Sequence, residues 1–427
     1  MACAMALLRK AHPSQAPPST SLLPTVQPST EEASDGQGKE FIPFELEEWQ
    51  SRYETTVTYN LADSGCHPVR LSELVSDPAA VEKLLAVDLH YPPVGGTDTL
   101  RELCASWHGA KPENILVTVG AAEANSITVA SLLRPGDHMV VMEPGYRQVR
   151  GCAANLGASV SAFPLDPARC WRPDLDALTA AVTPATRLIA VTNPNNPVGT
   201  ILTEAEMDAI VAAAASVGAW ILADEVYRGT ELWTDEVTPT FWGRYERVIC
   251  VGSLSKAFGL PGLRLGWLVG PPDFVEQAWR RHEYATIAAS TVSMHLAEIA
   301  LAPGTRERLL ARNRRLIRDG YARLECWVEA SGGLLSICAP AATALGFVRY
   351  HLDAPSVEVA HALRTKGDVL VGAGAHFGIE HHLRITHGLE PQVLEAALQR
   401  IFAVLRDMKD PDAEKAGAVA SAAESTT

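Results

Sequence analysis

Short apolar runs alternate along the chain with longer segments of helical character. The runs NILVTVG, HMVVMEP, RLIAVTN, WILADEV and RVICVG each end in turn or polar residues, and helix-like segments such as EAEMDAIVAAAASVG lie between them. Alternating buried strands and helices predict an α/β fold, with a mostly parallel sheet between helices. Ligands of such sheets bind beyond the carboxyl ends of the strands, so the polar residues there are candidates for a binding site.

The length of the chain predicts more than one lobe, because 427 residues exceed what a single hydrophobic core usually holds. We expect an N-terminal arm over residues 41–75, a large domain over 76–300 and a small C-terminal α/β domain over 301–409. Residues 1–40 are rich in Pro, Ser and Thr, and we expect them and residues 410–427 to be disordered tails. An organellar transit peptide within residues 1–40 is the alternative.

Charge and cysteine content exclude several classes of function. The net charge of −14 argues against binding to nucleic acid or to an anionic membrane, and no apolar stretch is long enough to span a bilayer. The eight cysteines form no CxxC pair. In a chain of this size that pattern predicts reduced thiols in a cytoplasmic protein, with neither a disulfide framework nor a bound metal.

Polar and small residues follow several of the predicted strands. Gly120-Ala121-Ala122 opens a helix-like segment, which is typical of an anion site at a helix N-terminus. Asp224 ends the run WILAD, where a buried acid needs a cationic or hydrogen-bonded partner. The loop SLSKAFGLPGLRLGW, Ser253 to Trp267, brings two hydroxyls, an ammonium and a guanidinium to the end of another apolar run. Cations placed there predict an anionic ligand.

The order of these motifs resembles that of a known enzyme family. Gly120-Ala-Ala, Asn193-Pro-x-Asn196-Pro-x-Gly199, Asp224-x-x-Tyr227, Ser253-x-Ser255-Lys256 and Arg264 are similar to the motifs of the class I/II aminotransferases. These are pyridoxal-phosphate (PLP) enzymes of fold type I, the aspartate aminotransferase fold. The resemblance covers roughly residues 45–405 and implies that the large domain binds PLP.

The resemblance implies a role for each residue at the cofactor ring. Lys256 matches the lysine that joins the cofactor aldehyde and then moves the proton of the substrate α-carbon. Asp224 matches the carboxylate that keeps the pyridine nitrogen protonated. Asn196 and Tyr227 would hydrogen-bond the phenolic oxygen of the ring, and Tyr146 would stack on its face, although a packed core tyrosine is the alternative there.

The resemblance also implies where the charged ends of cofactor and substrate bind. The phosphate site would comprise Gly120, Ala121, Ala122, Ser253, Ser255 and Arg264. Tyr91 matches the tyrosine that reaches the phosphate of the neighbouring subunit, which implies a homodimer with shared sites. Arg384 matches the arginine that binds the α-carboxylate of an amino-acid substrate, and the resemblance places Asn196 at the substrate as well as at the cofactor.

One segment departs from the common family pattern. Residues 63–68, Asp-Ser-Gly-Cys-His-Pro, are similar to the corresponding segment of the capreomycidine synthase branch, whose members eliminate a β-substituent and cyclise a hydroxylated arginine. Gly65 would lie near the substrate, and His67 is either a proton-transfer group or an ordinary loop histidine. The general motifs favour an aminotransferase, which we expect to belong to specialised metabolism, and the segment 63–68 favours the alternative, a β-eliminating cyclase. PLP-binding transcription regulators share this domain, but residues 1–40 lack the composition of a basic winged helix.

Overall fold

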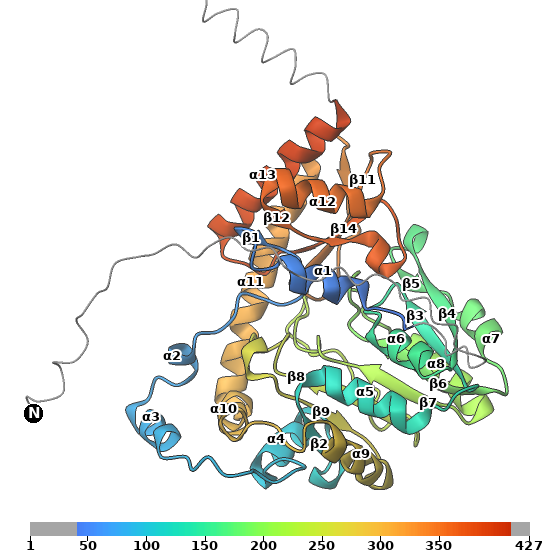
Figure 1. The fold of residues 1–427 in the computed structure, drawn as a ribbon, viewed down its shortest axis with the longest axis vertical. Coiled ribbons are helices and arrows are strands. Elements are labelled where there is room, and N and C mark those ends of the chain that lie inside the picture. Colours follow the sequence, from blue (N-terminus) through green and yellow to red (C-terminus); the bar gives the residue numbers. More distant parts are fainter. Residues whose placement is uncertain (1–40, 411–427) are drawn as a thin grey trace, which may run out of the picture. The chain divides into compact units, whose positions relative to one another are not determined.

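The protein is described by a computed structural model over residues 41–410, in which helices and strands alternate along most of the chain (Figure 1). The predicted tails are residues 1–40 and 410–427, and all of their residues except Asp410 lie outside the described residues. Within the described part, no helix combines the length and the apolar character needed to cross a bilayer.

An eight-stranded sheet forms the centre of the large part of the fold, in the order β2-β9-β8-β7-β6-β3-β4-β5. The expectation of a mostly parallel α/β sheet is confirmed, because β4, β3, β6, β7 and β8 run parallel while β9 and β5 are antiparallel to their neighbours. The strands are β2 (Ile115–Thr118), β3 (His138–Glu143), β4 (Ser159–Asp166), β5 (Arg172–Pro173), β6 (Thr186–Thr192), β7 (Trp220–Asp224), β8 (Val248–Ser253) and β9 (Gly266–Val269).

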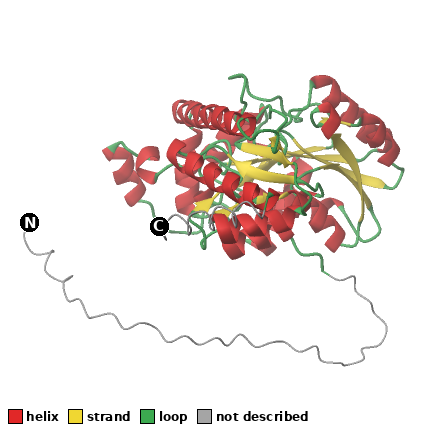
Figure 2. Cartoon of the chain, turned by 90° about the horizontal axis from the view of Figure 1, so that it is seen from above, coloured by secondary structure: helices red, strands yellow, loops and turns green. Residues whose placement is uncertain are grey.

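Helices cover both faces of this sheet (Figure 2). Successive residues of a strand face opposite sides, and in β3 Val140 and Met142 join one apolar core while Met139 and Val141 join another. Burial on both faces explains why the strands are continuous apolar runs. One face carries α4 (Asp98–His108), α7 (Leu175–Ala181), α8 (Glu204–Val217) and α10 (Thr291–Leu301), and the other carries α5 (Gly120–Leu132), α6 (Gln148–Asn155) and α9 (Pro272–Ala285).

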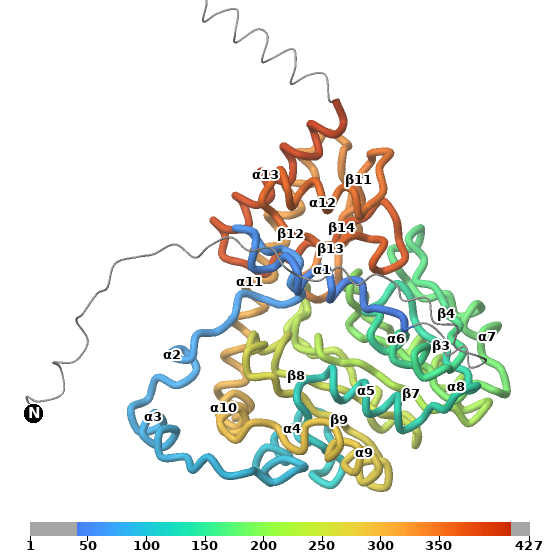
Figure 3. The backbone as a smooth tube through the Cα atoms, in the orientation of Figure 1, coloured from blue at the N-terminus to red at the C-terminus, as the bar shows by residue number. Residues whose placement is uncertain are grey.

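A second, antiparallel sheet with its own apolar core follows in the C-terminal part of the chain. Its strands, in spatial order, are β10 (Leu335–Ser336), β11 (Leu345–Tyr350), β14 (His382–Thr386) and β13 (Gly372–Ala373). It is accompanied by α11 (Pro303–Glu329), α12 (Ser356–Gly367) and α13 (Pro391–Lys409). Helix α11 is long enough to contact α10 at one end and α13 further along (Figure 3). The domain boundary at residue 300 stays a prediction.

The segment before the large sheet pairs with the C-terminal part of the fold. Strand β1 (Tyr59–Asn60) runs parallel to β12 (Val369–Leu370), and α1 (Glu45–Tyr53) contacts β13. Two short helices, α2 (Leu71–Leu74) and α3 (Pro78–Leu85), then lead towards α4. Four 3-10 turns complete the described elements: η1 (Pro112–Asn114), η2 (Pro167–Arg169), η3 (Pro261–Leu263) and η4 (Gly374–Phe377).

The prediction that all cysteines are reduced is wrong for one pair. Cys170, between η2 and β5, forms a disulfide with Cys338, which follows β10, and their Cα atoms are 5.7 Å apart. The sequence separation of 168 residues leaves no local spacing motif that could reveal this pair. The other described cysteines are free thiols, three of them buried.

Candidate active site

A cavity of about 560 Å³ lies at the carboxyl ends of β6, β7 and β8, the edge of the sheet at which the sequence places its polar residues. The N-terminus of α5, the loop after β8 and the segments on either side of β1 complete the wall. Ten of the predicted site residues line it: Ala121, Ala122, Tyr146, Asn196, Asp224, Tyr227, Ser253, Ser255, Lys256 and Arg264.

Lys256 lies in the wall of the cavity with its amine held by a serine. Its Nζ donates a hydrogen bond to the Oγ of Ser64 at 2.6 Å, and the Asp63 carboxylate is 4.0 Å away. Burial lowers the pKa of the Lys256 amine, and the Asp63 charge only partly opposes this effect. A lowered pKa increases the fraction of neutral amine, the form that attacks an aldehyde.

Asp224, the last residue of β7, presents a buried carboxylate to the same cavity. Its oxygens accept hydrogen bonds from the Asn125 amide at 2.9 Å and from the Val226 N–H at 3.3 Å. Burial raises the pKa of Asp224, and no cation of the described residues forms an ion pair with it. A buried carboxylate without a cation suits a ligand that brings its own N–H⁺, such as a protonated pyridine ring.

A cluster of donors around the start of α5 and the loop after β8 forms a cradle for an anion. The Arg264 guanidinium approaches the Oγ of Ser255 at 3.5 Å, and Ser253 donates to Ser255 at 3.0 Å. Among residues 41–410, Arg264 pairs with no carboxylate. The first N–H groups of α5, at Ala121 and Ala122, have no partner within their helix and line the same cavity. This donor set fits a phosphate group.

Gly120 makes the close approach of this cradle possible. Its φ is +75°, and a Cβ at this position would lie 2.7 Å from an Nη atom of Arg264. Gly266 has a similar role on the other side, because a Cβ there would lie 2.6 Å from the backbone nitrogen of Ala121. A side chain at Gly120 would push the guanidinium away from the helix start, and one at Gly266 would push the helix start away from β9.

Arg384, in β14 of the second sheet, borders the cavity behind Asn196. Its side chain is 1% exposed and donates to the Oδ1 of Asn196 at 3.1 Å and to the Ala62 carbonyl. Its guanidinium also lies 5.2 Å from the centre of the Phe377 ring. No carboxylate of the described residues forms an ion pair with this buried cation, so the site fits a ligand that carries a carboxylate.

Two tyrosines complete the wall. The Tyr227 hydroxyl donates to the Ser64 carbonyl at 3.2 Å. The Tyr146 hydroxyl donates to an Oε of Glu47 at 2.7 Å, and its ring centre is 4.9 Å from that of Phe44. Tyr146 is therefore held by the α1 segment at the cavity, and its stacking on a cofactor ring stays a prediction.

The remaining predicted residues lie around or away from the cavity. Gly65 packs on the lysine loop, since a Cβ there would lie 3.6 Å from the Ser255 carbonyl oxygen and 4.0 Å from Cδ of Lys256. Tyr91 is 89% exposed and does not line the cavity of its own chain. His67 does not line the cavity either, and its backbone N–H donates to the Gly388 carbonyl at 2.7 Å.

Three residues of the site were not predicted from the sequence. Ser64 contacts both Lys256 and Tyr227, Asn125 bonds Asp224, and Glu47 bonds Tyr146. Asn125 lies one helical turn beyond the Gly120-Ala-Ala motif, and a polar residue on the sheet-facing side of a buried helix was the available signal. The resemblance placed Gly65 near the substrate but gave no role to Ser64 beside it. Glu47 lies far from the sheet in sequence, and only the fold brings it to the cavity.

Comparison with known proteins places this site in context. A family model described as aminotransferase class I and II matches residues 85–401. Capreomycidine synthase of Streptomyces vinaceus is 31% identical over 373 residues, which is 86% of this chain and 95% of that protein. A crystal structure of a PLP-dependent aminotransferase from Streptococcus suis has a TM-score of 0.81 at 30% identity, covering 86% of this chain and 99% of that one. The structure of the PLP-dependent cyclase OrfR has a TM-score of 0.78 at 27% identity, covering 88% and 100%.

Proposed function

Since this chain belongs to the class I and II aminotransferase family, we propose that it moves the amino group of an α-amino acid to a 2-oxo acid. It is a PLP-dependent transferase. The cofactor, when bound, withdraws electrons from the substrate α-carbon and so makes its proton removable. The protein supplies the groups that bind, orient and exchange protons.

Each part of the site has a separate task in this proposal. The cradle of Ser253, Ser255 and Arg264 with the α5 N-terminus would hold the phosphate. Asp224 would accept the ring N–H and keep that nitrogen charged. The neutral amine of Lys256 would take the α-proton and return it at the neighbouring carbon of the cofactor.

The observation that carries the proposal is the arrangement of three groups around one cavity. Lys256 and Asp224 line it, and Arg384 borders it through its hydrogen bond with Asn196. The base and the buried carboxylate belong to the large sheet, whereas Arg384 belongs to the second sheet. A substrate carboxylate on Arg384 would therefore orient the α-carbon between the two parts of the fold, within reach of Lys256.

A β-eliminating cyclase is the second candidate. It is favoured by the similarity to capreomycidine synthase along 95% of that protein and by the likeness to the cyclase OrfR. Lys256 and Asp224 serve either reaction, because both begin with removal of the α-proton. The outcome then depends on whether the substrate carries a leaving group on its β-carbon.

Turnover without an acceptor distinguishes the two reactions. The PLP-loaded enzyme is incubated with a panel of α-amino acids, including β-hydroxylated and arginine-like members, and no 2-oxo acid. An aminotransferase forms at most one equivalent of keto product per site and resumes when a 2-oxo acid is added. Repeated turnover without acceptor, with loss of the β-substituent, would replace the first proposal by the cyclase.

Assembly and location belong to the same proposal. We propose a homodimer in which Tyr91 of each chain contacts the cofactor phosphate in the site of the other chain. In support, Tyr91 is exposed and does not line the cavity of its own chain. We also propose that the protein is located in the cytoplasm, where thiols stay reduced. Cys170 and Cys338 do not support this location, because they form a disulfide. Fractionation of cells together with alkylation of free thiols tests the location and the state of this pair.

A further inference from the structure

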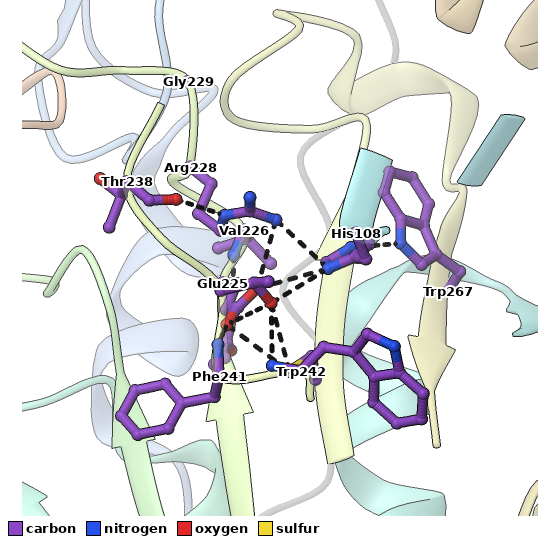
Figure 4. Close-up of polar contacts among 12 residues, drawn as sticks. His108, Glu225, Val226, Arg228, Gly229, Thr238, Phe241, Trp242 and Trp267 are labelled. Atoms are coloured by element: carbon purple, nitrogen blue, oxygen red, sulfur yellow. Dashed lines mark hydrogen bonds and ion pairs between the residues drawn. The ribbon is translucent and has the colours of Figure 1, made fainter. Parts of the chain in front are cut away.

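A buried polar cluster lies on the face of the large sheet opposite the cavity, directly behind Asp224. We define the Glu225 cluster as Glu225, His108, Arg228 and Thr240; Figure 4 shows the first three with their neighbours. Glu225 is 2% exposed, and His108 and Arg228 are also buried. Asp224 and Glu225 are consecutive, and their side chains leave the backbone on opposite faces because residues alternate along a strand.

Glu225 is tied by hydrogen bonds to the segment that follows β7 and to β8. Its carboxylate accepts from the Phe241 N–H at 2.7 Å and from the Thr240 hydroxyl at 2.8 Å, both in the segment between β7 and β8. The Cys250 thiol of β8 approaches one carboxylate oxygen at 3.5 Å. The backbone N–H of Glu225 donates to the Val251 carbonyl at 2.9 Å, which extends the β7–β8 ladder by one residue.

The contacts of His108 determine its protonation. The Trp267 indole N–H, which can only donate, lies 3.0 Å from Nε2 of His108, so this nitrogen is the acceptor. The remaining hydrogen is then on Nδ1, which lies 3.4 Å from the Glu225 carboxylate. An Nη of Arg228 lies 3.2 Å from the same nitrogen, but a guanidinium only donates, so no hydrogen bond joins these two groups. Burial lowers the pKa of His108 and keeps the ring neutral. His108 therefore supplies a hydrogen-bond donor and no charge.

Arg228 supplies the positive charge that balances Glu225. One Nη lies 3.4 Å from the carboxylate, and Nε donates to the Thr238 carbonyl at 2.8 Å. The backbone N–H of Arg228 donates to the Glu225 carbonyl at 3.0 Å. Residues 225 and 228 are thus joined both by their side chains and by a backbone hydrogen bond. Tyr227 lies in the turn between them.

We propose that Glu225 is a positioning residue that fixes Asp224 and Tyr227 from behind the sheet. Among the described residues, the hydrogen-bond donors to the Asp224 carboxylate are neutral, the Asn125 amide and the Val226 N–H. On the opposite face of the sheet, the ion pair with Arg228 and the backbone hydrogen bonds of Glu225 hold the peptide that joins Asp224 to Glu225. The direction of the Asp224 carboxylate towards the ring nitrogen then depends on Glu225. This inference rests on the role proposed for Asp224.

Binding of two cofactor forms to the apoprotein tests the inference without measuring activity. The first is PLP, and the second is its 1-deaza analogue, in which a C–H replaces the ring nitrogen that would contact Asp224. Asp224→Asn sets the reference, and we expect it to reduce the preference for PLP over the analogue. Glu225→Gln is expected to reduce this preference in the same direction by about tenfold. Thr240→Val removes the hydroxyl that donates to Glu225 and accepts from the Trp242 N–H, but removes no charge. We expect it to reduce the preference for PLP in the same direction and by less than about tenfold.

A matched control separates positioning from general destabilisation. Glu231 is also buried, pairs with Arg314 at 2.5 Å and does not line the cavity. It has no hydrogen bond with Glu225, although it accepts from the backbone N–H groups of Gly229 and Thr238. Glu231→Gln should lower the unfolding midpoint as Glu225→Gln does, because each leaves a buried arginine without its partner. It should change the preference for PLP over the analogue much less than Glu225→Gln does, because Glu231 meets the Glu225 cluster only through Gly229 and Thr238.

The possible results lead to different conclusions. If Asp224→Asn changes the preference and Glu225→Gln changes affinity for both cofactor forms equally, Glu225 has only a structural role and the inference is wrong. An equal loss in the Glu231→Gln control would contradict it as well. If Asp224→Asn itself leaves the preference unchanged, the error lies in the role proposed for Asp224.

Discussion

Asp224 and Glu225 are neighbouring carboxylates in opposite electrostatic environments. Burial raises the pKa of Asp224, which pairs with no cation of the described residues. Burial also disfavours the charge of Glu225, but Arg228 and several hydrogen bonds outweigh it and lower the pKa of Glu225. The protein itself therefore supplies the cation that balances Glu225, whereas a bound molecule would have to supply the cation for Asp224.

The variant Asp224→Asn tests this difference at the residue scale. We expect kcat to fall by roughly 10³-fold or more, about 4 kcal/mol of transition-state stabilisation, because an amide does not hold the ring nitrogen in its charged form. The apoprotein should be at least as stable as the wild type at neutral pH. The raised pKa means that the folded state binds a proton more readily than the unfolded chain, so ionisation of Asp224 costs stability as pH rises. Steady-state kinetics and denaturant unfolding measure the two effects, and unchanged turnover would remove Asp224 from the mechanism.

The lowered pKa of Lys256 predicts the pH dependence of cofactor attachment. Only the neutral amine reacts, so the rate at which the apoprotein forms a borohydride-reducible link to PLP should rise through a pKa below that of free lysine. Stopped-flow absorbance over a pH series measures this rate. The reduced link should map to Lys256, and Lys256→Ala should abolish it. A midpoint at or above the value of free lysine would contradict the effect of burial.

At the scale of elements, the turn between β2 and α5 depends on a glycine for two reasons. Gly120 has a positive φ, and Arg264 occupies the space where a side chain would project. The sequence identified the glycine as a small residue at a helix start, which fits any anion site. The structure adds the second reason, because it shows the guanidinium arriving from the loop after β8.

A pair of glycine variants separates these two reasons. Gly109 ends α4 with φ +66°, and no atom lies within 4 Å of the place that a Cβ would take there, whereas Gly120 has φ +75° and meets Arg264. Gly109→Ala and Gly120→Ala should each cost about 1 kcal/mol of stability through the backbone. Only Gly120→Ala should also weaken PLP binding, by roughly tenfold or more, because it displaces a charge-assisted phosphate contact. Cofactor titration of the apoproteins measures this, and equal affinities would show that Arg264 does not hold the phosphate.

The sequence was sufficient for the central strands and insufficient for the short ones. Runs such as RLIAVT and VICVG are buried on both faces, so their composition predicted β6 and β8 directly. Strands β1 and β12 have two residues each and exist because they pair with one another across the chain. The site shows the same limit of sequence-based prediction. Lys256 belongs to a recognisable motif, but its hydrogen bond with Ser64 depends on contacts between distant parts of the chain.

At the scale of the whole described chain, the Cys170–Cys338 disulfide connects the two sheets. Cys170 precedes β5 at the edge of the large sheet, and Cys338 lies between β10 and β11 of the second sheet, which also carries Arg384. Cys170 is exposed, so a reductant in solution can reach the bond. A cross-link over 168 residues restricts the unfolded chain strongly.

Reduction of this disulfide should therefore lower stability. We expect a loss of about 2–4 kcal/mol in the free energy of unfolding, measured by urea titration with and without a phosphine reductant. The double variant Cys170→Ser with Cys338→Ser should behave like the reduced protein and no longer respond to reductant. Cys326 is an exposed free thiol and provides the control, since Cys326→Ser should keep the full response. A reductant effect that persists in the double variant would assign the response to another group.

Tyr91 belongs to an exposed apolar surface that bears on the assembly of the protein. Leu85, Leu89 and Tyr91 are each at least 80% exposed, an apolar surface that a second copy of the chain would cover. If Tyr91 donates to the phosphate of the neighbouring site, Tyr91→Phe should weaken PLP binding by about 1.5–3 kcal/mol, the size of a hydrogen bond to a charged group.

Mixing two impaired variants then distinguishes shared sites from separate ones. Tyr91→Phe and Lys256→Ala are refolded together at a PLP concentration that Tyr91→Phe alone cannot use. In a mixed dimer, one site combines the intact lysine of the first chain with the intact tyrosine of the second, and the other site has neither. With random pairing, half of the dimers are mixed and half of their sites are intact, so roughly a quarter of wild-type activity should return. Separate sites give only the mean of the two variants, and a monomer by light scattering at micromolar concentration would exclude sharing altogether.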